Sequence, residues 1–473
     1  MIYSSSSSMF IHGSSLSHPT STAQYLPFDI LSEIFQYLPD LNLNLAEELE
    51  TDVISPKTGP YILRPEIYPW SITRVCSAWR TAAIYEPHLW SRVHLEVGQK
   101  QPSSGKVELL RLYLSRSRNC KLNVSLHCTW TERALDNAYL SLLFPTLGRW
   151  QFFSLHVLAK SLPVFWDLGN FPMLEILHLY VAHQAKTPPL NNINHIFQHA
   201  PRLHTIRYRH SDDRSVFVMP LDQLKVYQGP LSSIPADSGC DWISNLQWCA
   251  FAANGRQPEW ALTEVTAPHM REFSIRERIQ PVNTVAVLNI LTLPSLEIFR
   301  VKASGRMRLS DAIVGLLERS MCLLTELCLD VPDLTAMYMY PILRRTPQVV
   351  KLRITSKKLL PDFVQGWVYD PKTHAKNPCI LQHLESLDLG RCTFIPTAEI
   401  TLLQMIQSRW EVPGKMTAEK YFSGPATNSI TRLRTFQVPY KFQRTKRSQK
   451  KILRVWKEEG LDIQFGPGNQ NRL

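Results

Sequence analysis

Two histidines four residues apart are the best candidate for a metal site in this chain. His195 and His199 fall on a segment with helical spacing, beside Ile196 and Phe197. A zinc site needs further protein ligands, and no acidic residue nearby supplies one in a recognisable pattern. We therefore interpret the pair as ordinary surface or core histidines and expect no metal.

Catalytic signatures are missing elsewhere in the sequence. It contains no phosphate-binding glycine loop, no Gly-x-Ser-x-Gly elbow, no His-Glu-x-x-His and no calcium-loop pattern. The nine cysteines include no Cys-x-x-Cys pair, and Cys76, Cys249, Cys328 and Cys392 have apolar neighbours. Such thiols behave as small hydrophobic side chains. We expect reduced core cysteines, no cofactor, no catalytic residues and no enzymatic activity.

The most informative segment is an amphipathic helix near the N-terminus. In LPFDILSEIF, Pro27 marks the start and acidic residues follow near the positive end of the helix. The apolar positions form two adjacent rows, Ile30/Ile34/Leu38 and Leu31/Phe35. A helix of this length buries one row against its own small module. The other row therefore needs a partner.

Two further pieces follow in a fixed order, VCSAWR from Val75 and EPHLW ending at Trp90. Together the three pieces resemble the F-box, the motif by which substrate adaptors of SCF-type ubiquitin ligases bind a Skp-family linker. The chain resembles in particular the large basidiomycete families of F-box proteins. It implies a bundle of three helices. An ordinary N-terminal helical subdomain is the alternative.

The resemblance assigns roles to two sets of residues. The residues expected to bind the linker are Leu26, Pro27, Ile30, Leu31, Ile34 and Phe35. The residues expected in the F-box core are Val75, Cys76, Trp79, Leu89 and Trp90. Leu31→Asp is then expected to abolish linker binding and to leave the circular dichroism of the chain intact.

The module is longer than the usual F-box because of an insert. Residues 26 to 90 include a stretch at about 42–69 with four acidic residues followed by four prolines. This composition favours a solvated loop over a packed element. Fungal relatives of this type often carry a similar insert before the second helix, so the departure affects the loop more than the motif.

From residue 152 onward one apolar phrase recurs, with an apolar residue, two variable ones, then apolar, variable, apolar. Its occurrences are Leu174/Leu177/Leu179, Leu203/Ile206/Tyr208, Leu221/Leu224/Val226, Leu246/Cys249/Phe251, Met270/Phe273/Ile275, Leu296/Phe299/Val301, Leu324/Leu327/Leu329, Val349/Leu352/Ile354, Leu384/Leu387/Leu389 and Leu433/Phe436/Val438. The end of each phrase predicts a short strand with one apolar face. Irregular leucine-rich repeats have this pattern.

Helical spacing between the phrases completes the repeating unit. Several of these stretches end in a proline two residues before the next phrase, which marks the turn from helix to strand. These prolines are Pro172, Pro201, Pro268, Pro294 and Pro347. Stacked units give a curved solenoid, a horseshoe with parallel strands on its concave face. LESLDLGRC, ending at Cys392, also resembles the leucine-rich repeat consensus, and an irregular α/β domain remains the alternative.

The net charge of +12 raises a nucleic-acid hypothesis, but the charge is concentrated at the C-terminus. Eight basic residues and no acidic one lie between Lys441 and Lys457, which leaves +4 for the rest. Apolar residues there follow a helix and then a strand: Ile452, Leu453, Val455 and Trp456, then Leu461, Ile463 and Phe465. We expect a basic capping helix that ends near Gly460. A nuclear-import signal or a patch for an acidic partner is the alternative.

The 473 residues are too many for one compact unit. We expect an α/β chain with a disordered serine-rich leader at 1–22, an F-box at 23–95 and a solenoid at 96–473. Its leader lacks the features of a signal peptide, and no apolar run is long enough to cross a bilayer. The expected location is cytoplasmic, nuclear or both.

The F-box resemblance implies the function. The protein is expected to be a substrate-recognition adaptor of an SCF-type E3 ubiquitin ligase, with a Skp-family linker, through it a cullin, and a protein substrate as partners. A ligase-independent scaffold is the alternative, followed by a basic nucleic-acid-binding solenoid. The identity of the substrate does not follow from one sequence. The segment from Leu109 to Leu126 resembles the first helix and strand after the F-box in the same fungal families, which implies that module and solenoid pack together.

Overall fold

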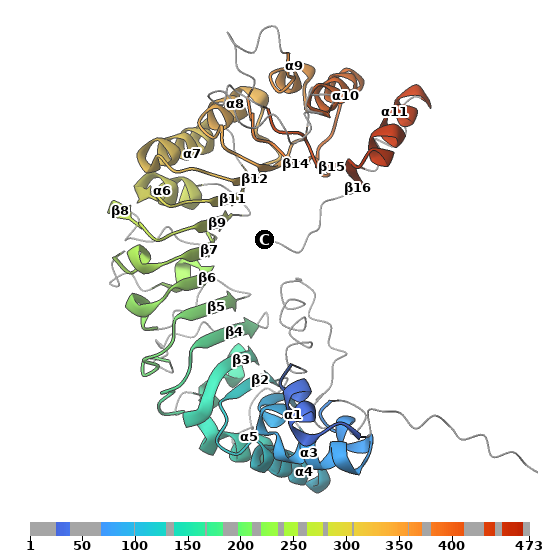
Figure 1. Cartoon of the computed structure of the whole chain (residues 1–473). Coiled ribbons are helices and arrows are strands. Elements are labelled where there is room, and N and C mark those ends of the chain that lie inside the picture. Colours follow the sequence, from blue (N-terminus) through green and yellow to red (C-terminus); the bar gives the residue numbers. More distant parts are fainter. Residues whose placement is uncertain are drawn as a thin grey trace, which may run out of the picture.

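A curved arc of stacked parallel strands, with a small helical bundle at its N-terminal end, is the architecture of the computed structural model (Figure 1). The structure describes residues 25–37, 68–98, 100–128, 137–165, 168–182, 197–210, 219–234, 241–253, 263–277, 282–304, 307–357, 359–370, 380–410, 430–439 and 447–466. The serine-rich leader, the insert up to residue 67, and His195 lie outside these ranges.

The N-terminal bundle consists of short helices: α1 (Phe28–Tyr37), η4 (Ile72–Arg74), α3 (Ser77–Tyr85) and η5 (Pro87–Trp90). The helix α1 begins directly after Pro27, whose carbonyl accepts a hydrogen bond from the Leu31 amide at 3.0 Å. Cys76 caps α3, since its Sγ accepts from the Trp79 amide at 3.5 Å. The chain then passes directly from η5 into the first strand.

In the described ranges, fourteen strands form one parallel sheet. They are β1 (Arg92–Val97), β2 (Leu122–Cys128), β3 (Trp150–Leu158), β4 (Ile176–Ala182), β5 (Thr205–His210), β6 (Val226–Pro230), β7 (Trp248–Ala252), β9 (Glu272–Arg276), β11 (Ile298–Lys302), β12 (Glu326–Asp330), β13 (Lys351–Thr355), β14 (Ser386–Asp388), β15 (Thr435–Val438) and β16 (Asp462–Phe465). Their order in the sheet follows the chain, so each strand pairs with its sequence neighbours. This topology confirms the α/β solenoid.

Helices cover the outer face of the arc (Figure 1). The α-helices are α4 (Ser104–Arg116), α5 (Ala138–Leu143), α6 (Val282–Ile290), α7 (Met307–Ser320), α8 (Ala336–Arg344), α9 (Pro361–Gln365), α10 (Pro396–Trp410) and α11 (Arg447–Glu458). Shorter 3₁₀ helices are η6 (Phe144–Arg149), η7 (Ala159–Phe165), η8 (Leu221–Gln223), η9 (Leu231–Ser233) and η11 (Asp241–Asn245). Beside them, β8 (Val265–Thr266) and β10 (Leu291–Thr292) form a second small sheet.

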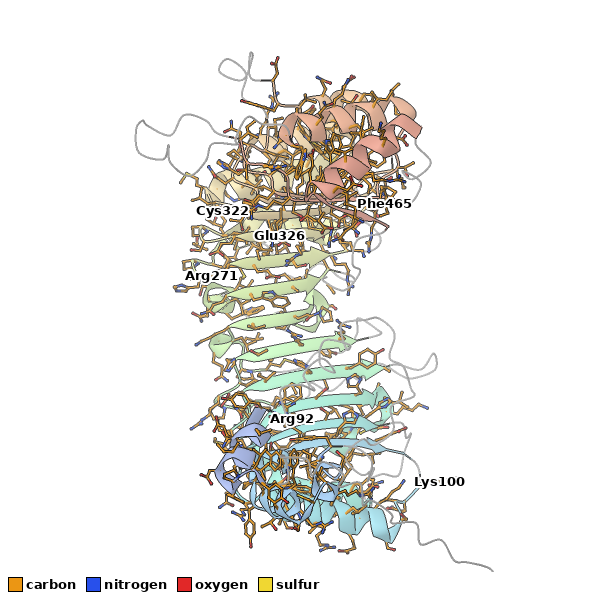
Figure 2. All side chains as sticks on the ribbon, turned by 45° about the vertical axis from the view of Figure 1, so that its right-hand side comes forward. Arg92, Lys100, Arg271, Cys322, Glu326 and Phe465 are labelled. Carbon is orange, nitrogen blue, oxygen red and sulfur yellow. The ribbon has the colours of Figure 1, made fainter. Side chains whose placement is uncertain are left out.

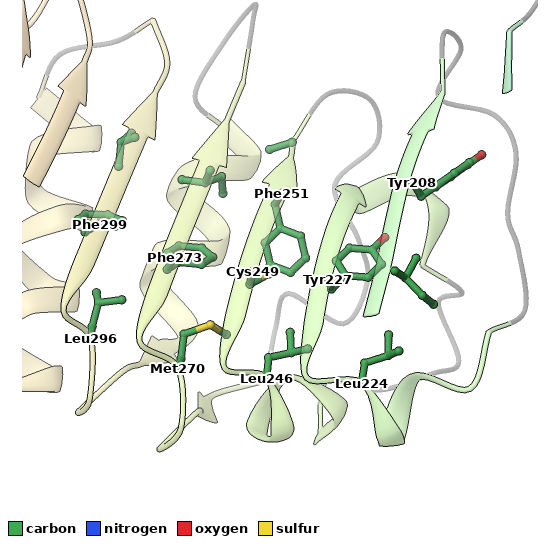
Figure 3. Packing of buried hydrophobic residues seen from close by; sticks show 14 of the residues in the cluster. Tyr208, Leu224, Tyr227, Leu246, Cys249, Phe251, Met270, Phe273, Leu296 and Phe299 are labelled. Atoms are coloured by element: carbon green, nitrogen blue, oxygen red, sulfur yellow. The ribbon is translucent and has the colours of Figure 1, made fainter. Parts of the chain in front are cut away.

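The core lies between the sheet and these helices. Alternate strand residues point into it, and corresponding positions of successive units stack in columns (Figure 3). Leu246, Met270 and Leu296 form one column, and the rings of Phe273 and Phe299 stack with centroids 6.0 Å apart. One unit cannot bury such a face alone, because each column needs the neighbouring unit to cover it.

One of the ten phrases is shifted by three residues. The sequence places Leu221, Leu224 and Val226 in the core, whereas the structure aligns Leu224, Tyr227 and Gly229 with the other units. Val226 lies on the opposite, half-buried side of the strand, and Leu221 belongs to η8. The sequence pattern does not reveal the shift, because glycine occupies the last position, where the pattern requires an apolar side chain.

The repeated prolines open tight turns. In each case the residue two after the proline donates its amide to the carbonyl three residues back, as Leu174 does to Phe171 and Leu203 to Ala200. Met270, Leu296 and Val349 make the same hydrogen bond. Proline suits the second position of such a turn because its φ is already fixed.

The domain boundary expected at residues 95/96 falls inside β1. Three strands, β1 to β3, precede the first phrase recognised in the sequence, and their inward positions include Trp150, Phe153 and Leu155. The aromatic residues are confined to β3, whereas the inward positions of β1 and β2 are valine and leucine, with Cys128 at the end of β2. The solenoid therefore begins at Arg92.

At the other end, α11 and β16 extend the sheet at the expected place. Gly460, with a φ of 103°, follows the helix, and the Leu461 amide donates to the Trp456 carbonyl at 2.9 Å. Only part of the expected apolar side is inside. Leu453 and Trp456 are buried, whereas Ile452 and Val455 are exposed.

Candidate protein-binding surfaces

The helix α1 presents two apolar rows to different surroundings. Leu31 and Phe35 are 1% and 0% exposed, and the Phe35 ring packs edge-on against Trp79 with centroids 5.4 Å apart. The neighbouring row points away from the bundle, with Ile30 and Ile34 47% and 37% exposed. A helix that is apolar on two sides is stabilised by the first side and leaves the second open to a partner.

The structure divides the six residues expected to bind a linker. Pro27, Ile30 and Ile34 are exposed and Leu26 is half-buried, while Leu31 and Phe35 belong to the interior of the bundle. An aspartate at position 31 would place a carboxylate in this interior, where it has no partner and disrupts the fold. Leu31→Asp is therefore not a test of binding alone, contrary to the expectation from sequence.

The five residues expected in the F-box core also differ in burial. Leu89 and Trp90 are fully buried, and Trp79 and Cys76 are half-buried. Val75 is 53% exposed, because it lies in the turn between η4 and the cap of α3 and faces solvent. Further exposed apolar side chains in this bundle are Tyr25, Phe28, Tyr37 and Tyr85.

Aromatic side chains fix the bundle to the solenoid. The Trp90 indole donates to the Ala83 carbonyl at 2.7 Å and packs against Tyr113 of α4, with ring centroids 5.3 Å apart. The Tyr113 hydroxyl donates to the Arg92 carbonyl at 2.6 Å, and burial raises the pKa of this tyrosine. Arg116 lies over the Trp90 ring at 4.4 Å. These contacts attach the bundle, which contains α1, to the first strand of the solenoid.

The second large surface is the concave face of the sheet, where the other half of the strand residues lies in rows (Figure 2). From β9 to β14 these rows contain paired charges. Arg300 bridges Glu272 and Glu326, and Arg353 contacts Asp388 at 2.6 Å. Asp330 is shared by two cations, Lys302 at 3.5 Å and Arg391 at 3.3 Å. Acidic and basic side chains therefore lie next to one another on this half of the face.

The half from β1 to β5 has a different composition. It presents His94, His127, His156 and His178, one from each of the first four strands, and two arginines from β5. Burial lowers the pKa of His156 to about 4, with further lowering by the positive charges of nearby histidines and Arg209. Burial, then Arg207, lowers the pKa of His178 to about 3.

Sequence reasoning missed this set of histidines. The signal was present, because each histidine alternates with the inward apolar residues of its strand, as in His156 between Leu155 and Val157. It became a surface only when the strand registers were known. No group of three or more His, Cys, Asp or Glu side chains in the described part of the chain is placed to hold a metal ion. His199 is exposed.

Among the described helices, none is long and apolar enough to span a bilayer. No family model matches the sequence, and no curated protein matches it. Among solved structures, an internalin from Listeria monocytogenes is similar to 74% of this chain and to 98% of its own chain, with a TM-score of 0.31 and 11% sequence identity.

Proposed function

We propose that this protein is a non-enzymatic substrate-recognition adaptor of an SCF-type E3 ubiquitin ligase. In this proposal α1 and its neighbours act as the F-box that binds a Skp-family linker, and the solenoid binds a protein substrate. The supporting motif residues are Leu-Pro-x-x-Ile-Leu from Leu26, Val-Cys-x-x-Trp-Arg from Val75 and Pro-x-Leu-Trp from Pro87. The expected location is the cytoplasm, the nucleus or both.

The observation that carries the proposal is the bare apolar row of α1. Ile30 and Ile34 follow Pro27 on one side of the helix, and the bundle covers the other side. Covering the exposed part of the two isoleucines contributes on the order of 1 kcal/mol each. The helix α1 lies in the bundle at the N-terminal end of the arc (Figure 1), and Ile30 and Ile34 are exposed there. A linker therefore has access to this row.

The proposed mechanism is proximity. The linker connects the bundle to a cullin, and the arc holds the substrate at a fixed position relative to α1, since Trp90 and Tyr113 join bundle and sheet. A ubiquitin-conjugating enzyme on the cullin then meets substrate lysines at high effective concentration. The adaptor itself makes and breaks no covalent bond.

The test uses the full chain and a purified Skp-family linker. The variant Ile30→Asp/Ile34→Asp places two charges on the exposed row and should abolish co-purification with the linker. Because both side chains face solvent, its thermal unfolding should match the unaltered protein. A matched control is Ile400→Asp on α10, an isoleucine that is 50% exposed at the far end of the solenoid.

Two results would decide against the proposal. If the double variant still binds the linker, the exposed row of α1 is not part of the interface. If Ile400→Asp loses linker binding to the same extent, the effect of the charges is non-specific. Linker binding without cullin-dependent ubiquitylation of a captured partner would instead support the scaffold. A nucleic-acid binder would show affinity that falls steeply with salt and is lost when residues after Phe442 are removed.

A further inference from the structure

The large sheet ends at β16, at the C-terminal tip of the arc (Figure 1). Among the described strands, β16 pairs only with β15, whereas each inner strand of this sheet has a neighbour on both sides. The helix α11 comes directly before β16 and is the last helix in the described ranges. The tip therefore presents a strand edge at the place where the next unit of a longer solenoid would be added.

The main chain of β16 shows which groups face this edge. The amides of Asp462 and Gly466 donate to carbonyls at the two ends of β15, at 3.0 Å and 2.9 Å. Successive residues of a strand direct their N–H and C=O groups to opposite edges. The amides and carbonyls of Ile463 and Phe465 therefore face away from β15. An edge of this kind is a template for another extended chain.

The helix α11 adds positive charge on the same open side. Glu459 accepts a hydrogen bond from the indole of Trp410 on α10 at 2.7 Å, so this side of α11 faces the preceding unit. With about 100° per residue, Lys457 and Arg454 lie about 160° and 140° around the helix from Glu459. Both side chains are exposed. They thus face away from α10 and toward the open end.

Carboxylates are fewer at this end of the chain, and two of them already have partners. Residues 441–466 include eight basic and three acidic residues. Glu459 is bound to α10, and Asp462 accepts from the side-chain amide of Gln464 at 2.7 Å. The third, Glu458, lies about 100° around the helix from Lys457. Arg454 and Lys457 have no ion pair within the described part of the chain.

We propose that this tip binds an extended acidic segment of a partner protein as an additional strand. We call the outward main chain of Ile463 and Phe465, together with Arg454 and Lys457, the C-terminal edge site. Main-chain hydrogen bonds to β16 would supply affinity, and acidic side chains of the segment would pair with the two cations. The inference goes beyond the proposed function and does not depend on it, since β16 and α1 lie at opposite ends of the solenoid.

Two other occupants fit the C-terminal edge site less well. A second copy of the chain would bring its own Arg454 and Lys457 to the same edge, where like charges repel. Cations beside an edge strand are a known protection against such self-pairing. A nucleic acid would pair with the cations but has no extended amide chain to match the edge of β16.

The experiment measures binding of a short fluorescein-labelled peptide to the full-length protein by fluorescence anisotropy. In the peptide, threonine alternates with glutamate, because threonine favours an extended chain. It should bind at least about fivefold more tightly than the same peptide with glutamine in place of glutamate. N-methylation of every amide keeps the charge but removes the donors, and it should weaken binding by at least about fivefold.

A matched pair of variants tests the main chain of β16. Phe465→Pro and Phe465→Ala both remove a half-buried ring, but only proline removes the outward N–H. Phe465→Pro should therefore bind the glutamate peptide at least about threefold more weakly than Phe465→Ala. Thermal unfolding shows whether both variants keep the terminal unit. If Phe465→Pro loses it, the N-methylated peptide decides the question, because it leaves the protein unaltered.

A second pair of variants tests the charge. Arg454→Gln/Lys457→Gln should weaken binding of the glutamate peptide by at least about fivefold and leave binding of the glutamine peptide unchanged. The matched control, Arg202→Gln/Lys225→Gln, removes two exposed cations near the start of β5 and β6. It should leave the affinity within about twofold.

Several outcomes would overturn the proposal. They are equal binding of the glutamate and glutamine peptides, undiminished binding of the N-methylated peptide, and equal losses in the two double-glutamine variants. Tighter binding of single-stranded DNA at the same total charge would also contradict it, as would a dimer in sedimentation velocity that Phe465→Pro abolishes and Phe465→Ala retains. Ile30→Asp/Ile34→Asp should bind the peptide like the unaltered protein, so this proposal and the proposed function fail separately.

Discussion

His156 and His178 illustrate how a single side chain can make a fold sensitive to pH. Burial is the main cause of the low pKa of both side chains. Nearby groups lower it further: His127, His94 and Arg209 for His156, and Arg207, His156 and Arg209 for His178. Their pKa values fall from 6.5 to about 4 and about 3. In the folded chain these rings therefore remain neutral across the whole range of physiological pH.

The consequence is a loss of stability in mild acid. Below pH 6.5 the unfolded chain binds protons at these positions while the folded chain does not, so the unfolding free energy falls as the pH falls. The loss from His156 levels off below about pH 4. Each histidine contributes up to about 2 kcal/mol between pH 6.5 and pH 5. Urea unfolding at several pH values measures the slope.

His156→Gln/His178→Gln should flatten this slope, since glutamine does not titrate. His199→Gln is the matched control, because His199 is exposed. A double variant with the slope of the unaltered protein would show that other groups carry the acid sensitivity.

At the same scale, two buried residues show what a sequence does and does not reveal. Cys392 stands at the consensus Asn/Cys position, and its thiol donates to the Ile354 carbonyl of the preceding unit at 3.2 Å. Arg409 gave no such signal. It is fully buried, and its guanidinium donates to the carbonyls of Trp367, Ile380 and Leu381. Its partners come from loops that only the fold brings together.

At the scale of elements, α1 carries residues that stabilise the bundle directly beside residues that are exposed to a partner. Leu31 is sealed against the bundle, whereas Ile30 is half exposed on the next row. Leu31→Asp should lower the stability of the N-terminal bundle by several kcal/mol, because it removes buried apolar area and buries an unpaired charge. Ile30→Asp should change stability by about 0.5 kcal/mol or less.

Thermal unfolding followed by tryptophan fluorescence distinguishes the two variants, since Trp79 and Trp90 report on the bundle. The bundle of Leu31→Asp should unfold at a lower temperature than the bundle of the unaltered chain. The unfolding curve of Ile30→Asp should match that of the unaltered chain. Equal shifts in the two variants would place both rows in the same environment and contradict the two-row geometry.

The repeating units were readable from sequence where leucine or a close substitute fills all three positions. Nine phrases occupy the expected core positions, as Leu384, Leu387 and Leu389 do. The pattern was misaligned at β6, where Gly229 occupies the last position, and the strands β1 to β3 precede the first phrase that was recognised. Periodicity detects apolar side chains, whereas register also depends on hydrogen bonding between neighbouring strands.

At the scale of the whole molecule, the joint between bundle and arc decides whether a bound linker and a bound substrate have a fixed separation. Tyr113 is the centre of this joint, since it contacts Trp90 and Trp70 and hydrogen-bonds the Arg92 carbonyl. Truncating a buried aromatic side chain costs about 3–5 kcal/mol. In a solenoid this loss acts on adjacent units, because each unit contacts only its neighbours.

Tyr113→Ala should therefore accelerate amide hydrogen exchange in α3, η5 and β1 and leave β9 to β14 unchanged. The matched control is Tyr340→Ala, which removes a ring that packs on Phe363 of α9 at 5.0 Å and a hydroxyl that donates to the Asp362 carbonyl. It should accelerate exchange in α9 and spare α3. Faster exchange in β1 with an unchanged α3 would show that the bundle is held without Tyr113, and that the joint lies elsewhere.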